Sequence, residues 1–414
     1  MADSALPPIV PIVTRAARES LQLQGELLAS WAHGRVNLIG EHTDYNDGWV
    51  LPVTIARAIA FVGQLSADPD DTTIRLFSLR YRQVVELDAT RLPTAAMPQD
   101  APGWARYVAG AVAVLRERGF PIGGFSAAID GDIPVGGGLS SSAALLIAVL
   151  GWLNQALHLE LPPLELARIA QQAETLGSGV RVGILDQAAS ALGKPGHAIL
   201  IDCRSLEYLY IPFLLPNTRF LMCDTGVERA LAQSGYNERR AQCEEAVQAL
   251  AAAMQSEGDT RPIRALRDVT WHDFLRLAGH IPEPARRRAR HVVRENQRTL
   301  DAVETLRAGD AHAFGDLVLQ SHASLRDDYA VSCPELDAVV EIATAIPGAL
   351  GARMVGAGFG GGALIVAQAD AVPAIQDALH AHYPIRTGKQ PAIFEVIPDG
   401  GPGTALVDGV NQAH

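Results

Sequence analysis

The sequence predicts a chain of two domains that both mix helices and strands. Its 414 residues exceed what one ordinary hydrophobic core accommodates. Runs rich in β-branched residues alternate with helical spacing in the first half, whereas helical spacing dominates the second half. A glycine-rich loop interrupts the pattern in each half. We therefore place a domain boundary near residue 205, which divides the chain into residues 1–205 and 206–414.

The first 90 residues predict one helix followed by strands. Residues 14–28 show the spacing of an amphipathic helix. Residues 29–40 contain a short apolar run that ends at a glycine, which indicates a buried strand. Residues 49–65 are dense in apolar and β-branched residues and are expected to form strands. The Asp- and Pro-containing segment 68–71 predicts a turn, and residues 74–87 predict a hairpin.

Helices become more frequent in the rest of the first half. Residues 104–118 have apolar residues at helical spacing on one side. Residues 123–129 resemble a strand that enters a glycine-rich loop, and the long apolar run 141–157 then predicts a buried helix. We expect a further helix at 164–176 and a return to strand at 198–202.

The second half is predicted to be rich in helices. Helical spacing covers residues 238–254, 284–307 and 311–325. The second glycine-rich loop, 356–362, precedes a strand-like run at 363–367. The tail after Pro398 is rich in Gly and Pro, and we expect it to be loose.

Charge and cysteine content narrow the class of protein. The formal net charge is -12, from 46 acidic and 34 basic side chains, which disfavours binding to nucleic acid or to an anionic membrane. No apolar run approaches the roughly 18 residues of a membrane helix, and no secretory signal is visible at the N-terminus. The four cysteines lie far apart without a C-x-x-C pair, which is typical of free thiols in a reducing compartment. We expect a cytoplasmic protein.

The first chemical cluster follows the predicted strand 29–40. Glu41 and Asp44 flank His42, and carboxylates accept hydrogen bonds from the hydroxyls of a polyol. Arg35 lies near the other end of the same strand and stays charged at physiological pH. This cluster favours a sugar site. The alternative from composition alone is a solvated loop with ordinary surface charges.

The second cluster is the loop from Gly131 to Ala144, which contains three successive glycines and then three serines. Successive glycines allow backbone N–H groups to point into one concavity, and the N-terminus of the following helix attracts phosphate. The serines offer hydroxyls to phosphate or to a magnesium ion. The loop lacks the Walker pattern G-x-x-x-x-G-K-[ST]. The alternative is a glycine turn with a serine cap.

The third cluster pairs Glu174 with Asp186. Phosphoryl transfer requires a group that accepts the proton of the attacking hydroxyl and a metal that bridges the β- and γ-phosphates. Glu174 is suited to the metal and Asp186 to the hydroxyl, since magnesium takes only one or two protein ligands. The alternative is an exposed helical glutamate and a helix-capping aspartate.

Together the three clusters resemble the galactokinase family, within the kinase superfamily that also includes homoserine, mevalonate and phosphomevalonate kinases. The family signature is matched by residues 34–46, its phosphate loop by 134–143 and its third motif by 351–361. The resemblance extends from about residue 30 to about residue 395. It implies an α+β fold with an N-terminal domain like ribosomal protein S5, a ferredoxin-like C-terminal domain and an active site in the cleft between them.

The resemblance also implies an activity and its residues. The expected enzyme is an ATP- and Mg²⁺-dependent sugar kinase that phosphorylates the anomeric hydroxyl of galactose, with Asp186 and Arg35 as catalytic residues and Arg35 stabilising the charge of the transition state. Whether Asp186 is a true base or an orienting acceptor stays open. Ser142 and Glu174 are the implied magnesium ligands. The implied sugar contacts are Glu41, His42, Thr43, Asp44, Gly183 and Tyr236. The implied nucleotide contacts are Ser78, Trp104, Gly136, Gly137, Gly138, Leu139, Ser140, Ser141 and Ser142.

The sequence departs from the family pattern at three positions, and several functional alternatives remain. His33 stands where proline is usual, Leu185 where methionine is usual and Val355 where threonine is usual, which removes a hydroxyl near the phosphate site. A kinase of N-acetylgalactosamine or arabinose is the first alternative. A sugar sensor without turnover is the second, and the intact serines and Asp186 disfavour it. A kinase of a non-sugar substrate is the third, and the signature around Glu41 disfavours it. We expect a monomer whose partners are a sugar and ATP.

Overall fold

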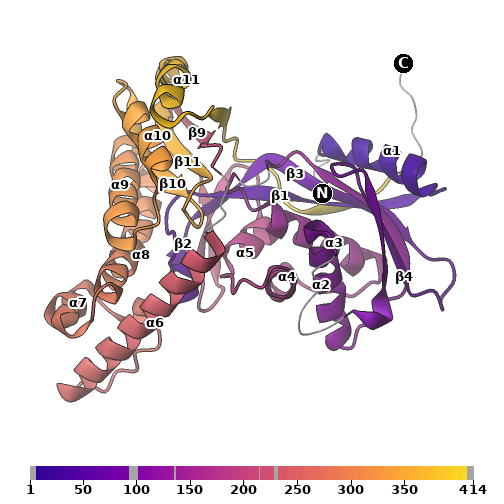
Figure 1. Ribbon diagram of the computed structural model, residues 1–414, viewed down its shortest axis with the longest axis horizontal. Helices are drawn as coiled ribbons and strands as arrows, with labels where there is room; N and C mark the ends of the chain where they lie inside the picture. The colour runs from indigo at the N-terminus through magenta and orange to yellow at the C-terminus, as the bar shows by residue number, and fades with distance from the viewer. Residues whose placement is uncertain (1–5, 93–100, 135–136, 214, 228–231, 408–414) are drawn as a thin grey trace.

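The computed structural model describes residues 6–92, 101–134, 137–213, 215–227 and 232–407. Figure 1 shows two lobes that are joined near the middle of the molecule. One lobe holds the elements from α1 to β8 and the last strand, and the other holds the elements from β9 to β12.

The N-terminal lobe is built on one mixed sheet. The strands run in the order β13-β1-β3-β6-β4-β5, with β7 beside β3 and joined to β2 and β8. Most neighbours are antiparallel, and β4 runs parallel to β6. The strands are β1 (Leu27–Asn37), β2 (Trp49–Val50), β3 (Pro52–Leu65), β4 (Thr73–Ser78), β5 (Gln83–Asp88), β6 (Phe125–Gly131), β7 (His197–Asp202), β8 (Tyr208–Pro212) and β13 (Gly403–Val407).

Helices cover both faces of this sheet. Helix α1 packs on β3 and β6 from one side, and α3 packs on β1 and β3 with α2, α4 and α5 around it on the other (Figure 1). Phe61 of β3, Phe125 of β6 and Trp152 of α3 meet with ring centroids 5.2–6.2 Å apart and fill the core between them. The helices are α1 (Ile9–Leu21), α2 (Gly103–Glu117), α3 (Ser141–Ala156), α4 (Pro163–Ser178) and α5 (Leu185–Leu192).

The C-terminal lobe has an antiparallel sheet in the order β10-β11-β9-β12. Its chain order, strand–helices–strand–strand–helix–strand, together with this spatial order is the ferredoxin-like arrangement. The strands are β9 (Thr218–Asp224), β10 (Ala349–Val355), β11 (Gly362–Gln368) and β12 (Ala392–Glu395). The helices are α6 (Ala232–Ser256), α7 (Trp271–Leu277), α8 (Ala285–Ala308), α9 (Ala311–Ser324), α10 (Pro334–Thr344) and α11 (Val372–Thr387). The α+β prediction is confirmed.

An apolar cluster joins the two lobes. Val36 and Leu38 of the N-terminal lobe belong to the same buried cluster as Phe220 of β9 and Leu364 of β11. Val355 is also buried in this cluster, so the valine that replaces the usual threonine serves packing. Burial of apolar surface between the lobes holds the clusters of the N-terminal lobe in a fixed position relative to the second glycine-rich loop of the C-terminal lobe.

Two expectations from the sequence were wrong. The first helix spans Ile9–Leu21 rather than 14–28, because residues 27 and 28 already pair in β1. The tail after Pro398 was expected to be loose, but Gly403–Val407 form β13, which pairs antiparallel with β1. The paired residues are 372 to 380 positions apart, from Trp31 with Gly403 to Leu27 with Val407, so no local pattern could indicate this pairing.

Two further features bear on the domain boundary and on membranes. Strand β8 follows residue 205 and still pairs with β7 of the N-terminal sheet, as β13 does with β1. The N-terminal sheet therefore continues past the boundary placed near residue 205. None of the helices within the described residues has the length and apolar character that crossing a membrane requires.

Candidate active site

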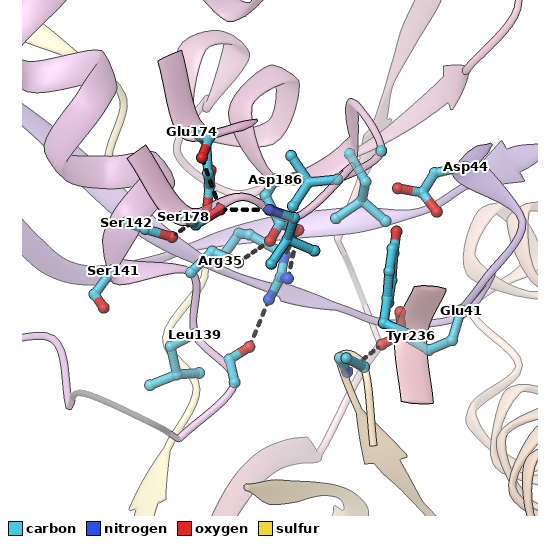
Figure 2. A pocket seen from close by; sticks show the side chains of 18 of the residues that line it. Arg35, Glu41, Asp44, Leu139, Ser141, Ser142, Glu174, Ser178, Asp186 and Tyr236 are labelled. Carbon is cyan, nitrogen blue, oxygen red and sulfur yellow. Dashed lines mark hydrogen bonds and ion pairs between the residues drawn. The ribbon is translucent and has the colours of Figure 1, made fainter. Parts of the chain in front are cut away.

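A cavity of about 520 Å³ lies where the two lobes meet. Most of the residues predicted from the sequence line it together, although they come from β1, the loop after it, the phosphate loop, α4, α5 and α6 (Figure 2). The predicted residues that line it are Arg35, Glu41, His42, Asp44, Gly138, Leu139, Ser140, Ser141, Ser142, Glu174, Gly183, Asp186 and Tyr236. Gly136 lies outside the described residues.

The centre of the cavity is an ion pair between Arg35 and Asp186. Arg35 Nε donates to Asp186 Oδ1 at 2.7 Å, and its Nη2 contacts the same oxygen. Ser140 Oγ donates to the other oxygen, Oδ2, at 2.5 Å. Arg35 is buried, whereas the Asp186 side chain keeps 34% of its exposure. The carboxylate is thus held from two sides and still open toward the cavity.

The phosphate loop is fixed to the same ion pair. Arg35 Nη1 donates to the carbonyl of Gly138 at 2.6 Å. Gly138 and Ser140 both adopt positive φ, 82° and 55°, which turns the chain into the N-terminus of α3. The free N–H groups and dipole of this 16-residue helix face the cavity through Ser141 and Ser142. Gly137 does not line the cavity and instead lies against Asp224 of β9.

Glu174 of α4 lies beside this helix end. Ser142 Oγ donates to Glu174 Oε1 and Gln187 Nε2 donates to Oε2, each at 2.6 Å. Burial raises the pKa of Glu174 to about 7, against the two hydrogen bonds that favour its charge. The residue is therefore not the exposed helical glutamate that composition alone allows. A buried carboxylate beside a hydroxyl is a pair of hard oxygen donors that suits a cation.

Glu41 is held by both lobes. Its Oε1 accepts from Arg353 Nη2 at 2.7 Å and from the backbone N–H of Gly356 at 2.8 Å, and its Oε2 accepts from Asn37 Nδ2 at 3.0 Å. Arg353 is fully buried. These donors occupy most of the acceptor capacity of the carboxylate and fix its orientation toward the cavity.

Asp44 lies on the opposite side of Asp186 from Ser142 (Figure 2). Its removal from water and the nearby charge of Asp186 raise the pKa of Asp44 to about 7. A Cβ at Gly183 would lie 1.6 Å from Asp44 Oδ2, so only glycine allows this close approach. Hydroxyl groups that donate hydrogen bonds to Asp44 would lower this pKa again and favour its charged form.

His42 is held in a left-handed conformation at φ 64°. Its Nδ1 is 2.8 Å from Tyr45 Oη, which is 2.6 Å from Tyr329 Oη in the other lobe. Burial lowers the pKa of His42 to about 3. The imidazole is therefore neutral at physiological pH and acts as a hydrogen-bonding group.

Of the two remaining predicted sugar contacts, Tyr236 lines the cavity and Thr43 does not. The Tyr236 ring lines the cavity 5.9 Å from the His42 ring, and burial raises the pKa of its hydroxyl. Thr43 does not line the cavity. Its Oγ1 lies 2.8 Å from the carbonyl of Gly40 and 2.7 Å from that of Trp49, so it closes the loop that carries Glu41 and Asp44.

A second hollow of about 360 Å³ adjoins the cavity. The predicted residues Ser78 and Trp104 line it, and Tyr107, Ser141 and Ser142 line both spaces. A long ligand could therefore extend past the N-terminus of α3 from one space into the other.

Sequence reasoning missed the residues that hold the site together. Arg353 was quoted as part of the third motif, but no pattern linked it to Glu41, which lies 312 positions earlier. Glu295 lies in the middle of α8 and accepts from the N–H of Gly40 at 3.1 Å. Gln187 directly follows Asp186 and could have been noticed from that adjacency.

Three family profiles match the chain. The profile "GHMP kinases N terminal domain" matches residues 106–194, "Galactokinase galactose-binding signature" matches 24–65 and "GHMP kinases C terminal" matches 302–385. The first covers α3, Glu174 and Asp186, and the second covers Arg35 to Asp44.

Curated relatives are similar over most of the chain. A galactokinase of Chloroflexus aurantiacus is 46% identical over 87% of this chain and 88% of its own length. A galactokinase of Chloroflexus aggregans is 45% identical over 86% and 88%. The crystal structure of Lactococcus lactis galactokinase complexed with galactose matches with a TM-score of 0.87 and 35% identity, over 95% of this chain and 98% of that one.

Proposed function

The chain belongs to the galactokinase family of the GHMP kinases and is thus an ATP-dependent sugar kinase, and from this premise we propose how its own residues carry out the reaction. The γ-phosphoryl group of ATP passes to the anomeric hydroxyl of D-galactose and gives galactose 1-phosphate. The single observation that carries this proposal is the Asp186 carboxylate, held by Arg35 and Ser140 beside the N-terminus of α3 and open to the cavity.

Asp186 lies between the two ends of the site, with Asp44 and Tyr236 on one side and Ser142 and Glu174 on the other (Figure 2). A sugar against the first group presents a hydroxyl to Asp186. Its oxygen attacks the γ-phosphorus, an O–P bond forms and the bond to the β–γ bridging oxygen breaks. The proton of the hydroxyl passes to Asp186, and ADP leaves.

Arg35 stabilises this step by its position. It is buried, contacts Asp186 through Nε and Nη2 and holds the Gly138 carbonyl through Nη1. The guanidinium thus aligns the carboxylate with the phosphate loop before the reaction begins. A fixed positive charge also stabilises negative charge that develops during phosphoryl transfer.

The groups proposed to hold the sugar can accept hydrogen bonds from its hydroxyls or donate to them. Glu41 has its carboxylate oriented by Arg353 and Gly356. Asp44 gains its charge when hydroxyls donate to it, which offsets the raised pKa. Neutral His42 and the Tyr236 hydroxyl add groups that donate or accept.

Magnesium fits the residues at the phosphate end. Glu174 Oε1 and Ser142 Oγ are 2.6 Å apart. Burial raises the pKa of Glu174 to about 7, and a bound cation would supply the positive charge that keeps this carboxylate ionised. We propose that these two residues hold Mg²⁺. The ion would neutralise charge on the β- and γ-phosphates when it is bound. The hollow lined by Ser78 and Trp104 is the proposed place of adenine.

The test is an ADP-release assay with galactose, N-acetylgalactosamine, arabinose and glucose. We expect galactose to give the highest kcat/KM. A higher value with N-acetylgalactosamine or arabinose would support the alternative kinase, and sugar binding without ADP release would support the sensor. Asp186→Asn, purified in the same way, serves as the control that measures ADP release by contaminating enzymes.

Compartment and assembly are proposals of the same kind. Cys203, Cys223, Cys243 and Cys333 are free thiols, which supports a reducing cytoplasm, where ATP is also available. We propose that the protein acts as a monomer, which light scattering at assay concentration checks.

A further inference from the structure

A separate hollow of about 440 Å³ lies behind the segment that binds the sugar. Trp49 of β2, Trp271 of α7 and a series of residues on α8 line it, with α9 closing one side. None of the residues assigned above to sugar, nucleotide or metal lines this hollow.

Three arginines line the hollow, and two of them form ion pairs. Arg267, Arg294 and Arg298 line it, against Asp301 as the carboxylate among the described lining residues. Arg267 is neutralised by Asp202, which it contacts at 3.0 Å, and it stacks on Trp49 at 4.2 Å. Arg298 pairs in the same way with Glu295 at 2.7 Å, so Arg294 is the arginine of the hollow that has no carboxylate partner within the described residues.

Arg298 has unused hydrogen-bonding capacity. Its side chain is about nine-tenths buried and donates through Nε to Glu295 Oε2 at 2.7 Å. Its Nη2 is buried and has no hydrogen-bond partner within the described part of the chain. A buried guanidinium N–H without an acceptor is unfavourable, so an acceptor that enters the hollow would be stabilised.

Arg294 lies one turn before Arg298 on α8. Residues four apart share a helix face, where two like charges repel each other. The Arg294 guanidinium lies 4.6 Å from the centroid of the Trp271 ring, which stacks on Phe274 at 5.2 Å. A divalent anion between the two arginines would relieve their repulsion and would accept from the unpartnered Arg298 Nη2.

We propose that this hollow binds a hexose phosphate. The phosphate lies between Arg294 and Arg298, which form charge-assisted hydrogen bonds to it. The sugar ring lies beside Trp271, whose ring is in contact with Phe274 and Arg294, and Gln297 and Gln320 line the hollow within reach of hydroxyls.

The site is connected to the sugar motif through two residues of α8. Glu295 accepts from Arg298 and from the N–H of Gly40, and Asn296 Oδ1 accepts from the N–H of Trp49 at 3.0 Å. Gly40 and Trp49 flank the segment that carries Glu41 and Asp44. A phosphate that attracts Arg298 changes the charge that Glu295 experiences, so occupancy alters galactose affinity. By linkage, galactose alters hexose phosphate affinity by the same factor.

Titration calorimetry with glucose 6-phosphate tests the binding. The full chain is saturated with galactose and Mg·ADP, so that the first cavity is filled. We expect one equivalent of glucose 6-phosphate to bind, inorganic phosphate to bind more weakly and glucose to give no heat. Equal affinity for inorganic phosphate would overturn the hexose assignment, and no binding would overturn the site.

Arg294→Gln is the decisive variant because Arg294 is exposed and outside the catalytic cavity. It should weaken glucose 6-phosphate binding about tenfold or more while leaving kcat without the probe unchanged. Arg287→Gln is the matched control, since it removes an exposed arginine of the same helix that pairs with Glu283 and does not line the hollow. Equal binding by Arg294→Gln and wild type would contradict the proposal. Glucose 6-phosphate should also shift the galactose Kd at least twofold in wild type and not in Arg294→Gln. An unchanged galactose Kd in wild type would contradict the coupling between the hollow and the sugar motif.

Discussion

Asp186 and Glu174 are two carboxyl groups in one cavity that the fold gives different surroundings. Asp186 is partly exposed, contacts a buried guanidinium and accepts from Ser140. Glu174 is buried, and its neighbours Ser142 and Gln187 are uncharged. The proposed roles follow this difference in surroundings: Asp186 accepts the proton of a hydroxyl, and Glu174 binds a cation.

Asp186→Asn should lower kcat by roughly 10²- to 10⁴-fold, the usual contribution of a general base. Galactose Kd should change only a few-fold, because the amide preserves the shape of the side chain. Steady-state ADP release and equilibrium galactose binding measure the two effects. Asp316→Asn on the exposed side of α9 is the control and should behave as wild type. Turnover of Asp186→Asn near the wild-type rate would rule out the proposed role.

The proposed role of Glu174 as a magnesium ligand predicts that the magnesium requirement depends on pH. Its pKa is raised to about 7, so a proton competes with the metal below that pH. The Mg²⁺ concentration for half-maximal activity should rise as pH falls from 8 to 6, by up to roughly tenfold per pH unit below 7. Activity titrations with Mg²⁺ at fixed ATP check this dependence. Glu174→Gln should need more Mg²⁺ at every pH and lose the pH dependence.

The same shift has a consequence for stability without metal. The folded pKa lies above the model value of 4.5, so the native state binds more protons between pH 4.5 and about 7, and stability falls through that window as pH rises. Glu174→Gln should therefore be more stable than wild type at pH 8, on the order of 1–3 kcal/mol, and equal to it near pH 4.5. Melting curves in EDTA would contradict this assignment if both proteins responded to pH alike.

At the scale of elements, α2 and α4 approach so closely that their backbones touch. A Cβ at Gly110 of α2 would lie 2.7 Å from the carbonyl oxygen of Ala173 in α4. Ala173 directly precedes Glu174, and Trp104 in the first turn of α2 lines the proposed adenine hollow. The small residue at this crossing thus sets the spacing between the helix that carries Trp104 and the helix that carries Glu174.

Gly110→Ala should destabilise the protein by about 1–2 kcal/mol, because overpacking costs more than the helix propensity gained. It should also raise the Mg²⁺ requirement, since α4 must shift with Glu174. Gly279→Ala is the matched control, as no atom lies within 4 Å of its added Cβ, and it should be neutral or slightly stabilising. Chemical denaturation measures both. Equal stabilities of the two variants would refute the close contact.

At the scale of the whole molecule, a buried charge network joins the lobes. Arg353 of β10 donates to Glu41 and to the carbonyl of Asn37, and both of these residues belong to the N-terminal lobe, at the end of β1 and just after it. Its Nη1 also lies 3.8 Å from Glu295 Oε1. Burial favours the neutral form of Glu295, but the charges of Arg298, His291 and Arg353 lower its pKa to about 2. Glu41, the proposed sugar ligand, is therefore positioned by the lobe to which it does not belong.

Arg353→Met should destabilise the protein by about 3–5 kcal/mol, because Glu41 is left as a buried charge without its partner. The double variant with Glu41→Gln should lose less than the sum of the single losses. Arg219→Met, which breaks the half-exposed pair with Glu395, is the control and should cost about 0–1 kcal/mol. Additive losses in the double-mutant cycle would argue against the coupling of the two lobes through this pair.

Local patterns determined the chemistry of this protein. The segment with Arg35, Glu41, His42 and Asp44, the glycine–serine loop and the pair of carboxylates carried the family resemblance that implied the class of reaction, whereas each cluster alone left a structural alternative open. Short-range order in the chain dictates strands, turns and helix starts. Helices such as α3 and α4 were predicted within two residues of their ends for the same reason.

Only the tertiary structure decided which residues meet. Arg35 and Asp186 are 151 positions apart, and Glu41 and Arg353 are 312 apart. Burial raised the pKa of Glu174, and the pairing of β13 with β1 ordered a tail that appeared loose. Such contacts depend on packing between distant segments, which periodicity along the chain does not record. The sequence therefore determined what each segment can do, and the folding of the two lobes against each other decided where they do it.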